Sequence, residues 1–200
     1  MLTVIDYKAG NLTSVVKALH FLGTEVFVTS QAEAMERATS MVLPGVGHFA
    51  ATARLEQGGL AEAIRRAIAR GVPFLGICVG MQWLYAGSTE APGHPGLGYF
   101  QQTVSRFPAN GQKVPHVGWN QLNELAATPL LKGVASGDFA YFTHSWRAPV
   151  GTETIVTTEY MGLFAAACQR ERVCGVQFHP EKSGATGLQI LRNFLEFSAC

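Results

Sequence analysis

Apolar runs and helical patterns alternate along the first part of the chain. Four short runs have the length and composition of buried parallel strands: residues 2–6, 25–29, 41–44 and 72–77. Between them apolar residues recur at helical spacing, and each set ends at a glycine: Val15, Leu19 and Leu22 before Gly23, and Leu60, Ile64 and Ile68 before Gly71. This alternation predicts an α/β fold with a parallel sheet.

The pattern changes near residue 98, after which strand patterns prevail. The clearest of these strands are residues 99–107, 139–146, 154–159 and 173–178. Residues 188–197 are again apolar at helical spacing, and residues 88–96, STEAPGHPG, predict a loop. Because no repeat, low-complexity tract or linker divides the chain, we expect one domain of residues 1–200. Its central sheet should be mostly parallel, flanked by helices, with additional antiparallel strands.

Composition narrows the classes of function. The 200 residues are 48% hydrophobic, which suits one globular domain with a substantial core. The net charge is +1 and the 15 basic residues are scattered, so neither nucleic acid nor a membrane surface is an expected partner. The N-terminal segment has no basic region, and no window approaches the roughly 18 apolar residues of a membrane span. We expect a soluble, cytoplasmic protein that acts on a small molecule.

The chain has four cysteines: Cys78, Cys168, Cys174 and Cys200. They form neither a dense disulfide framework nor a metal-binding CxxC pair. We expect reduced thiols and no bound metal.

One of these thiols lies in an unusual local sequence. In GICVGMQ, residues 76–82, Cys78 follows an apolar run and stands near glycines on both sides. A strand that ends at Ile77 and a helix that begins near Val79 place residue 78 at a sharp corner, as in a nucleophile elbow. The helix N-terminus stabilises a thiolate there. A buried structural cysteine is the alternative, but the nearby glycines favour the nucleophile.

A nucleophilic thiol requires a base, and six histidines compete for that role: His20, His48, His94, His116, His144 and His179. Only His179 comes with an orienting group, because in HPE the proline favours an extended backbone that lets Glu181 lie on the same side. Glu181 then resembles the third member of a triad. A solvated turn is the alternative interpretation of HPE, and the other histidines are interpreted as surface or packing residues.

Acyl chemistry also requires donors for a tetrahedral oxyanion. The N–H of Val79 is one, and the glycine-rich turn PGVG, residues 44–47, can supply another from the carboxyl end of the third strand. An ordinary loop is the alternative for PGVG. Gln82 lies one helical turn after Cys78, where its carboxamide can hold a polar substrate or simply cover the helix surface.

These motifs resemble those of the class I (triad) glutamine amidotransferases, in which GICVGMQ precedes FHPE and PGVG forms an oxyanion loop. Four further segments resemble the glutaminase subunits of imidazole glycerol phosphate synthase in histidine biosynthesis: IDYKAGN at residues 5–11, HVGWN at 116–120, YFTHS at 141–145 and HPEKS at 179–183. The resemblance spans nearly the whole chain and implies a flavodoxin-like amidotransferase domain.

The resemblance implies a triad of Cys78, His179 and Glu181 that hydrolyses glutamine through a thioester. It implies an oxyanion site at Val46, Gly47 and Val79, and no cofactor. The amino acid end of glutamine would be held by Gly45, Gly47, Gln82, Thr143, His144 and Ser145. The departures from the family pattern, Lys8-Ala9, Thr143 and Trp146, leave the triad intact.

The resemblance also implies a heterodimer with a cyclase subunit built as a (β/α)8 barrel. Ammonia would pass through the barrel to N'-(5'-phosphoribulosyl)formimino-aminoimidazole carboxamide ribotide, and the chain itself has no P-loop to bind a phosphorylated substrate. Asn11, Trp119 and Lys182 are assigned to the docking face. A core position for Trp119 and a solvated charge at Lys182 are their alternatives.

The family further implies regulation, since rotation of one peptide in PGVG would exchange a carbonyl for an N–H at the oxyanion site. Two other functions compete. Another class I amidotransferase would feed a different synthase, against which HVGWN and IDYKAGN argue. A flavodoxin-like binding module would leave Cys78 buried and unreactive.

Overall fold

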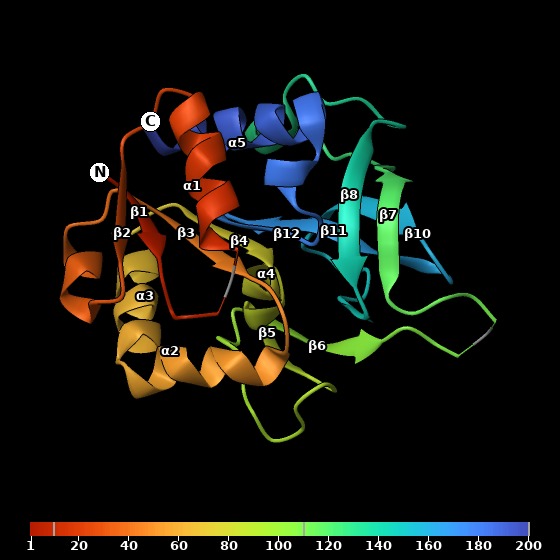
Figure 1. Cartoon of the computed structure of the whole chain (residues 1–200), viewed down its shortest axis with the longest axis horizontal. Helices are drawn as coiled ribbons and strands as arrows, with labels where there is room; N and C mark the ends of the chain where they lie inside the picture. The colour runs from red at the N-terminus through yellow and green to blue at the C-terminus, as the bar shows by residue number, and fades with distance from the viewer. Residues whose placement is uncertain (10, 110, 200) are drawn as a thin grey trace.

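The computed structural model describes residues 1–9, 11–109 and 111–199, so Gly10 of the IDYKAGN segment and Cys200 lie outside the described residues. A seven-stranded sheet runs through the molecule in the order β10-β11-β12-β4-β3-β1-β2 (Figure 1). Five of its strands are parallel: β1 (Leu2–Ile5), β2 (Val26–Thr29), β3 (Ser40–Gly45), β4 (Phe74–Cys78) and β12 (Val173–Val176). The antiparallel strands β10 (Thr154–Glu159) and β11 (Leu163–Arg170) complete it at one edge. The predicted fold class is confirmed.

Helices cover both faces of this sheet (Figure 1). On one face lie α1 (Leu12–Phe21) and α5 (Gly184–Ala199), and on the other lie α2 (Ala53–Gln57), α3 (Leu60–Ala69) and the short α4 (Val79–Trp83). Side chains of a strand alternate between the two cores: Val42 packs with the α1 and α5 side, while Met41 and Leu43 pack with α3. Within the described residues, four short 3-10 helices lie between these elements: η1 (Ala32–Glu36), η2 (Phe49–Thr52), η3 (Pro129–Leu131) and η4 (Pro180–Lys182).

Two smaller sheets stand beside the central one. The strands β5 (Tyr85–Ser88), β6 (Phe100–Arg106) and β9 (Trp146–Arg147) form the first, and the antiparallel pair β7 (His116–Gln121) and β8 (Phe139–His144) forms the second. The prediction of one strand over residues 139–146 is wrong in one respect, because the strand is interrupted at Ser145 and forms β8 and β9. The strands join different sheets there, which a local pattern of apolar residues does not reveal.

Several strands lie outside the predicted ranges. β5 follows α4 after one residue, so no turn signal marks its start, and the predicted loop 88–96 begins inside it at Ser88. β11 lies within the strand-rich region, but buried and exposed residues do not alternate along it, because residues 164–168 are all buried. β7 lies there as well and has exposed apolar residues, Val117 and Trp119. Among the described residues, no helix is long and apolar enough to cross a membrane.

Candidate active site

The sharp turn predicted at Cys78 is present. Cys78 is the last residue of β4 and has φ 55° and ψ −108°, an uncommon conformation for a residue with a side chain, and α4 begins immediately afterwards. Cys78 is buried. Backbone geometry of this kind aims the side chain out of the strand-to-helix corner, as a nucleophile elbow does.

Glycines on both sides make the corner possible. A Cβ added at Gly80 would lie 2.0 Å from the carbonyl oxygen of Leu43, and one added at Gly76 would lie 2.5 Å from the carbonyl oxygen of Gly80. α4 therefore packs directly on the main chain of β3 and β4. This contact holds Cys78 in its strained conformation.

The carboxyl ends of three adjacent parallel strands meet at this corner. β12, β4 and β3 are neighbours in the sheet, and they lead respectively to His179, to Cys78 and to the turn at residues 45–47. Open α/β sheets place their ligand sites at such ends. The order of the strands, which the sequence does not state, brings distant segments into one site.

His179 and Glu181 form a buried pair. His179 Nδ1 and Glu181 Oε1 are 2.9 Å apart, and the two side chains are 2% and 1% exposed. His179 has the extended backbone expected before Pro180, and its N–H donates to the carbonyl oxygen of Tyr141. Because the Nδ1 side contacts the carboxylate, Nε2 is directed elsewhere, and it has no hydrogen-bond partner among the described residues.

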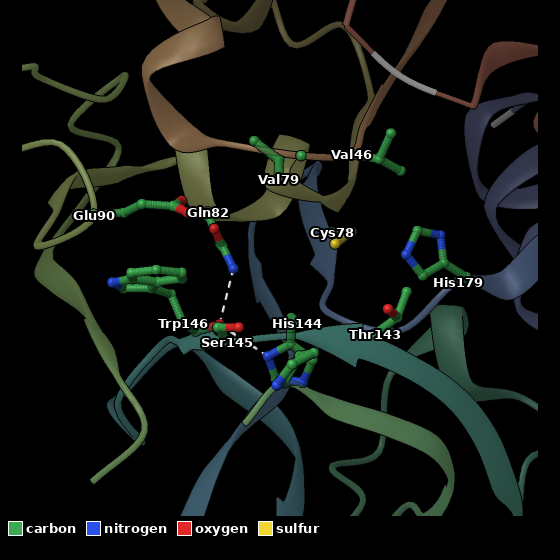
Figure 2. Close-up of a pocket in the computed structure, with 12 residues that line it drawn as sticks. Val46, Cys78, Val79, Gln82, Glu90, Thr143, His144, Ser145, Trp146 and His179 are labelled. Atoms are coloured by element: carbon green, nitrogen blue, oxygen red, sulfur yellow. Dashed lines mark hydrogen bonds between the residues drawn. The ribbon is translucent and has the colours of Figure 1, made fainter. Parts of the chain in front are cut away.

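The electrostatics of His179 favour its protonated form. Burial by itself lowers the pKa of His179, but the interactions with Cys78 and with the Glu181 carboxylate outweigh it and raise the pKa to about 10. Figure 2 shows the Cys78 sulfur beside the His179 ring. His179 can therefore carry a proton beside the Cys78 sulfur, an arrangement that suits a nucleophile with an adjacent proton donor.

Cys78 and His179 line a cavity of about 290 Å³ (Figure 2). Its wall brings together residues from six segments of the chain: Val46, Gly47, Cys78, Val79, Gln82, Glu90, Pro115, Thr143, His144, Ser145, Trp146 and His179. A cavity of this size and mixed polarity suits a small polar ligand. Seven of the eight residues expected to contact substrate or oxyanion lie on it with the nucleophile and base, and Gly45 does not.

The oxyanion side of the cavity is formed by main chain. Val79 provides the first N–H of α4, and Gly47 has φ +91°, a conformation that favours glycine. Outside the strands, no main-chain hydrogen bond of the described residues involves Val46 or Gly47. We expected Gly45 to contact the substrate. It lies instead within β3, opposite Cys78, and is buried behind the cavity.

Gln82 lies on the cavity wall but is fixed by the protein. Its Nε2 donates to the carbonyl oxygen of Trp146 at 2.9 Å and to Gln177 Oε1 at 3.1 Å. Gln177, a buried residue that sequence reasoning missed, in turn donates through Nε2 to Cys78 Sγ at 3.7 Å. Gln82 thus fixes the wall directly and the nucleophile through Gln177, and its side-chain amide nitrogen is not available to a ligand.

Residues 143–145 form the opposite wall. The side chain of His144 differs from our expectation, because its Nδ1 donates to the carbonyl oxygen of Trp146 at 2.8 Å and its Nε2 lies 3.4 Å from His116 Nδ1. The imidazole is therefore part of the protein's own hydrogen-bond network. Thr143, Ser145 and the main chain of this segment remain to contact a ligand.

Glu90 lines the cavity and is another residue that sequence reasoning missed. It belongs to the loop after β5, and its Oε2 accepts a hydrogen bond from the N–H of Phe49 at 2.8 Å. An acidic residue in a Pro/Gly-rich loop was the only local signal. The structure places this carboxylate at the cavity as its acidic group.

The residues assigned to docking lie on the surface. Trp119 is 55% exposed, so the alternative of a core tryptophan is wrong. Trp119 and Lys182 both approach Tyr141, with the Trp119 ring at 6.0 Å and the Lys182 Nζ at 5.8 Å from its ring centre. Asn11 precedes α1 and donates to Ser14 Oγ at 2.9 Å, and α1 contacts η4, which carries Lys182. The described residues contain no cluster of metal-ligating side chains.

The sequence matches the family described as glutamine amidotransferase class-I over residues 3–197. It is 44% identical over 203 residues to imidazole glycerol phosphate synthase subunit HisH of Caldanaerobacter subterraneus subsp. tengcongensis, covering 100% of both chains. It is 47% identical over 198 residues to the subunit of the same name from Moorella thermoacetica, covering 98% of this chain and 94% of that one.

Solved structures agree on the fold. A crystal structure of a glutamine amidotransferase has a TM-score of 0.78 at 22% identity and covers 99% of both chains. The structure of PurLQS from Thermotoga maritima has a TM-score of 0.75 at 19% identity, covering 98% of this chain and 97% of that one. With a family match over nearly its whole length and full-length relatives above 40% identity, the chain belongs to the class I glutamine amidotransferases.

Proposed function

We propose that this chain is the glutaminase subunit of an imidazole glycerol phosphate synthase. As one domain of residues 1–200, it hydrolyses glutamine and supplies ammonia to a partner cyclase. The names and full-length similarity of the relatives support this role. The observation that carries it is the elbow thiol of Cys78 beside the His179–Glu181 pair in one cavity.

The triad chemistry follows from this geometry. The Cys78 thiolate attacks the side-chain amide carbon of glutamine, and the carbonyl oxygen becomes an oxyanion that accepts hydrogen bonds from Val79 N–H and the main chain of residues 46–47. His179 Nε2, which has no partner within the described protein, donates its proton to the leaving nitrogen. Ammonia departs and leaves a thioester, which water hydrolyses to glutamate with His179 as base. Glu181 orients the imidazole throughout.

The cavity also offers partners for both ends of the amino acid. The Glu90 carboxylate is placed to pair with the α-ammonium group of glutamine, because only one of its oxygens has a hydrogen bond to Phe49. Thr143, Ser145 and their main chain are placed to receive the α-carboxylate. Gly47 completes this contact surface, whereas Gln82 and His144 act by fixing the walls.

The proposed partner is a cyclase subunit with a (β/α)8 barrel, and the two chains form a heterodimer in the cytoplasm. Ammonia would pass into the barrel and react with N'-(5'-phosphoribulosyl)formimino-aminoimidazole carboxamide ribotide, giving imidazole glycerol phosphate and aminoimidazole carboxamide ribotide. The names of the relatives, which describe them as subunits, support a partner. Trp119, Lys182 and Asn11 form the docking face in this proposal.

Regulation belongs to the same proposal. Outside the strands, the main chain of Val46 and Gly47 forms no hydrogen bond with other main-chain groups of the described residues, so rotation of one peptide there breaks few contacts. Ligand in the cyclase would favour the orientation that presents an N–H to the oxyanion. Without that ligand the carbonyl would face the oxyanion site, and the free subunit would be nearly idle.

Glutamate release from glutamine tests the proposal. We expect release by this chain only when a cyclase subunit and its ribotide substrate are present, and a loss of at least about 10⁴-fold in Cys78→Ala. Cys174→Ala is a matched control, since it removes a buried free thiol of β12 that does not line the cavity.

Three outcomes contradict parts of the proposal. Activity unaffected by Cys78→Ala, or absent under every condition, would favour a flavodoxin-like module with a structural cysteine. Activity stimulated only by another synthase would assign the chain to a different class I amidotransferase. Full activity of the isolated chain would refute the regulation.

A further inference from the structure

A hydroxyl group without a partner lies directly behind the proposed oxyanion turn. Tyr7 follows β1 and is 3% exposed, and its Oη has no hydrogen-bond partner among the described residues. Burying a hydroxyl without a partner is unfavourable, and such groups in native proteins call for an explanation. A second state of the site, in which this hydroxyl has an acceptor, would provide that explanation.

The Tyr7 hydroxyl is in contact with the main chain where β3 ends. A side-chain carbon built on Gly45 would lie 2.6 Å from Tyr7 Oη and 2.8 Å from the nitrogen of Gly80. The phenol therefore fills the space that any larger residue at position 45 would require. This contact also explains why a glycine that does not touch the cavity stands in the PGVG segment.

The Tyr7 hydroxyl lies outside the cavity that contains Cys78, since Tyr7 is not one of the lining residues. Burial raises the pKa of Tyr7, and negative charge at Cys78 raises it further against the opposing effect of Arg54. Tyr7 thus keeps its proton and remains a hydrogen-bond donor close to the nucleophile.

The turn itself has main-chain groups to offer. Outside the strands, Val46 and Gly47 make no main-chain hydrogen bond within the described residues, and Gly47 has a φ of +91° that permits unusual peptide orientations. In a trans peptide the carbonyl and the following N–H point in opposite directions. A carbonyl held on the Tyr7 side therefore directs an N–H into the cavity.

Resting on the proposed glutaminase function, we infer that Tyr7 is a positioning residue for the oxyanion turn. Its hydroxyl donates to a main-chain carbonyl of residues 45–47 when substrate is bound, and the adjoining N–H then faces the oxyanion. The hydroxyl that lacks a partner in the free chain gains one in the reacting complex.

The test is Tyr7→Phe in the complex of the full chain with a cyclase subunit and saturating ribotide ligand. The kcat of glutamine hydrolysis should fall about tenfold, the factor that corresponds to one ordinary hydrogen bond. KM for glutamine should stay within about twofold, since the groups that hold the amino acid end are unchanged. Tyr85→Phe, which removes a buried hydroxyl outside the cavity, should leave kcat unchanged.

Two further readouts separate positioning from general damage. Alkylation of Cys78 by iodoacetamide displaces iodide without forming a tetrahedral oxyanion, so Tyr7→Phe should react at the wild-type rate. The free variant should unfold at the wild-type temperature or above it, because a hydroxyl without a partner has been removed.

Specific results would overturn the inference. An unchanged kcat, a parallel loss of alkylation and hydrolysis, or a lower unfolding temperature of free Tyr7→Phe would each show that the hydroxyl does not act on the turn in the reacting complex alone. If the wild-type complex releases no glutamate, the proposed function itself has failed. Wild-type turnover that Tyr7→Phe leaves intact refutes only the role of Tyr7.

Discussion

The His116 and His144 imidazoles show what burial does to single side chains in this protein. They are 4% and 6% exposed, and His116 stacks on Tyr160 at 4.0 Å between ring centres. Burial lowers the pKa of His116 to about 4 and that of His144 to about 3. Both rings are therefore neutral at physiological pH, and the donor at each contact is determined. Asn120 donates to His116, His116 to His144, and His144 to the carbonyl oxygen of Trp146.

This pair predicts a loss of stability in weak acid. The unfolded chain binds protons at these histidines below about pH 6.5, while the folded chain does not until about pH 4 and 3. Their contribution to the free energy of unfolding is therefore present above pH 6.5 and is lost as the pH falls. As the pH falls from 7 to 5, each imidazole should lower the free energy of unfolding by about 2 kcal/mol.

Urea denaturation at several pH values measures this effect. His116→Gln should remove roughly half of the acid-induced loss that the pair causes, whereas His20→Gln, on the exposed side of α1, should leave the pH dependence as it is. An acid loss that is the same in His116→Gln and in wild type would contradict the assignment of the effect to this pair.

At the scale of elements, the catalytic corner depends on close packing of backbone on backbone. The helix α4 has only five residues, so its own hydrogen bonds do little to hold it in place. What fixes it is its contact with β3 and β4, made possible by glycines at the points of closest approach. The strained backbone of Cys78 is thus maintained by the sheet and not by local preference.

Gly80→Ala should therefore disrupt the corner. The added methyl group would lie 2.0 Å from the carbonyl oxygen of Leu43, a rigid main-chain atom. We expect the free energy of unfolding to fall by about 3 kcal/mol or more in urea denaturation, with loss of glutaminase activity. Gly58→Ala is the matched control, since its φ is −91° and its nearest neighbour is 3.5 Å away. Equal stability of the two variants would mean that α4 has room to move away from β3.

At the scale of the whole molecule, the sheet separates the proposed docking face from the opposite edge. β7 and β8 lie at one end of the molecule, and β2 is the edge strand at the other (Figure 1). β8 leads from the docking face to residues 143–145 of the cavity wall, because Tyr141 contacts Trp119 and His144 ends the same strand. A partner seated on Trp119 would thus rest on an element that also shapes the cavity.

Trp119→Ala should weaken binding of the cyclase subunit. Exposed tryptophans at interfaces are often dominant contacts, so we expect Kd to rise at least about 30-fold in titration calorimetry. Phe27→Ala is the control, because Phe27 is an exposed aromatic residue of β2, 41% exposed and far from β7. If Phe27→Ala weakens binding and Trp119→Ala does not, the docking face lies at the other edge of the sheet.

Several features of this protein follow from local patterns of residues. Apolar runs predicted the parallel strands, the glycines around Cys78 indicated the elbow, and HPE indicated that Glu181 could orient His179. Resemblance extended these motifs to a family, and the family match agrees. These features follow from backbone preferences of neighbouring residues, which a short segment carries with it wherever it lies.

The segments that meet across long distances in the chain could not be predicted from such local patterns. The order of β12, β4 and β3 brings His179 and Gln177 to Cys78, and the loop after β5 brings Glu90 to the same site. The tertiary structure also placed Gly45 behind the cavity and tied the His144 side chain to Trp146. The physical reason is that strand order and side-chain contacts are set by packing and hydrogen bonding between elements far apart in sequence. No periodicity within a single element records them.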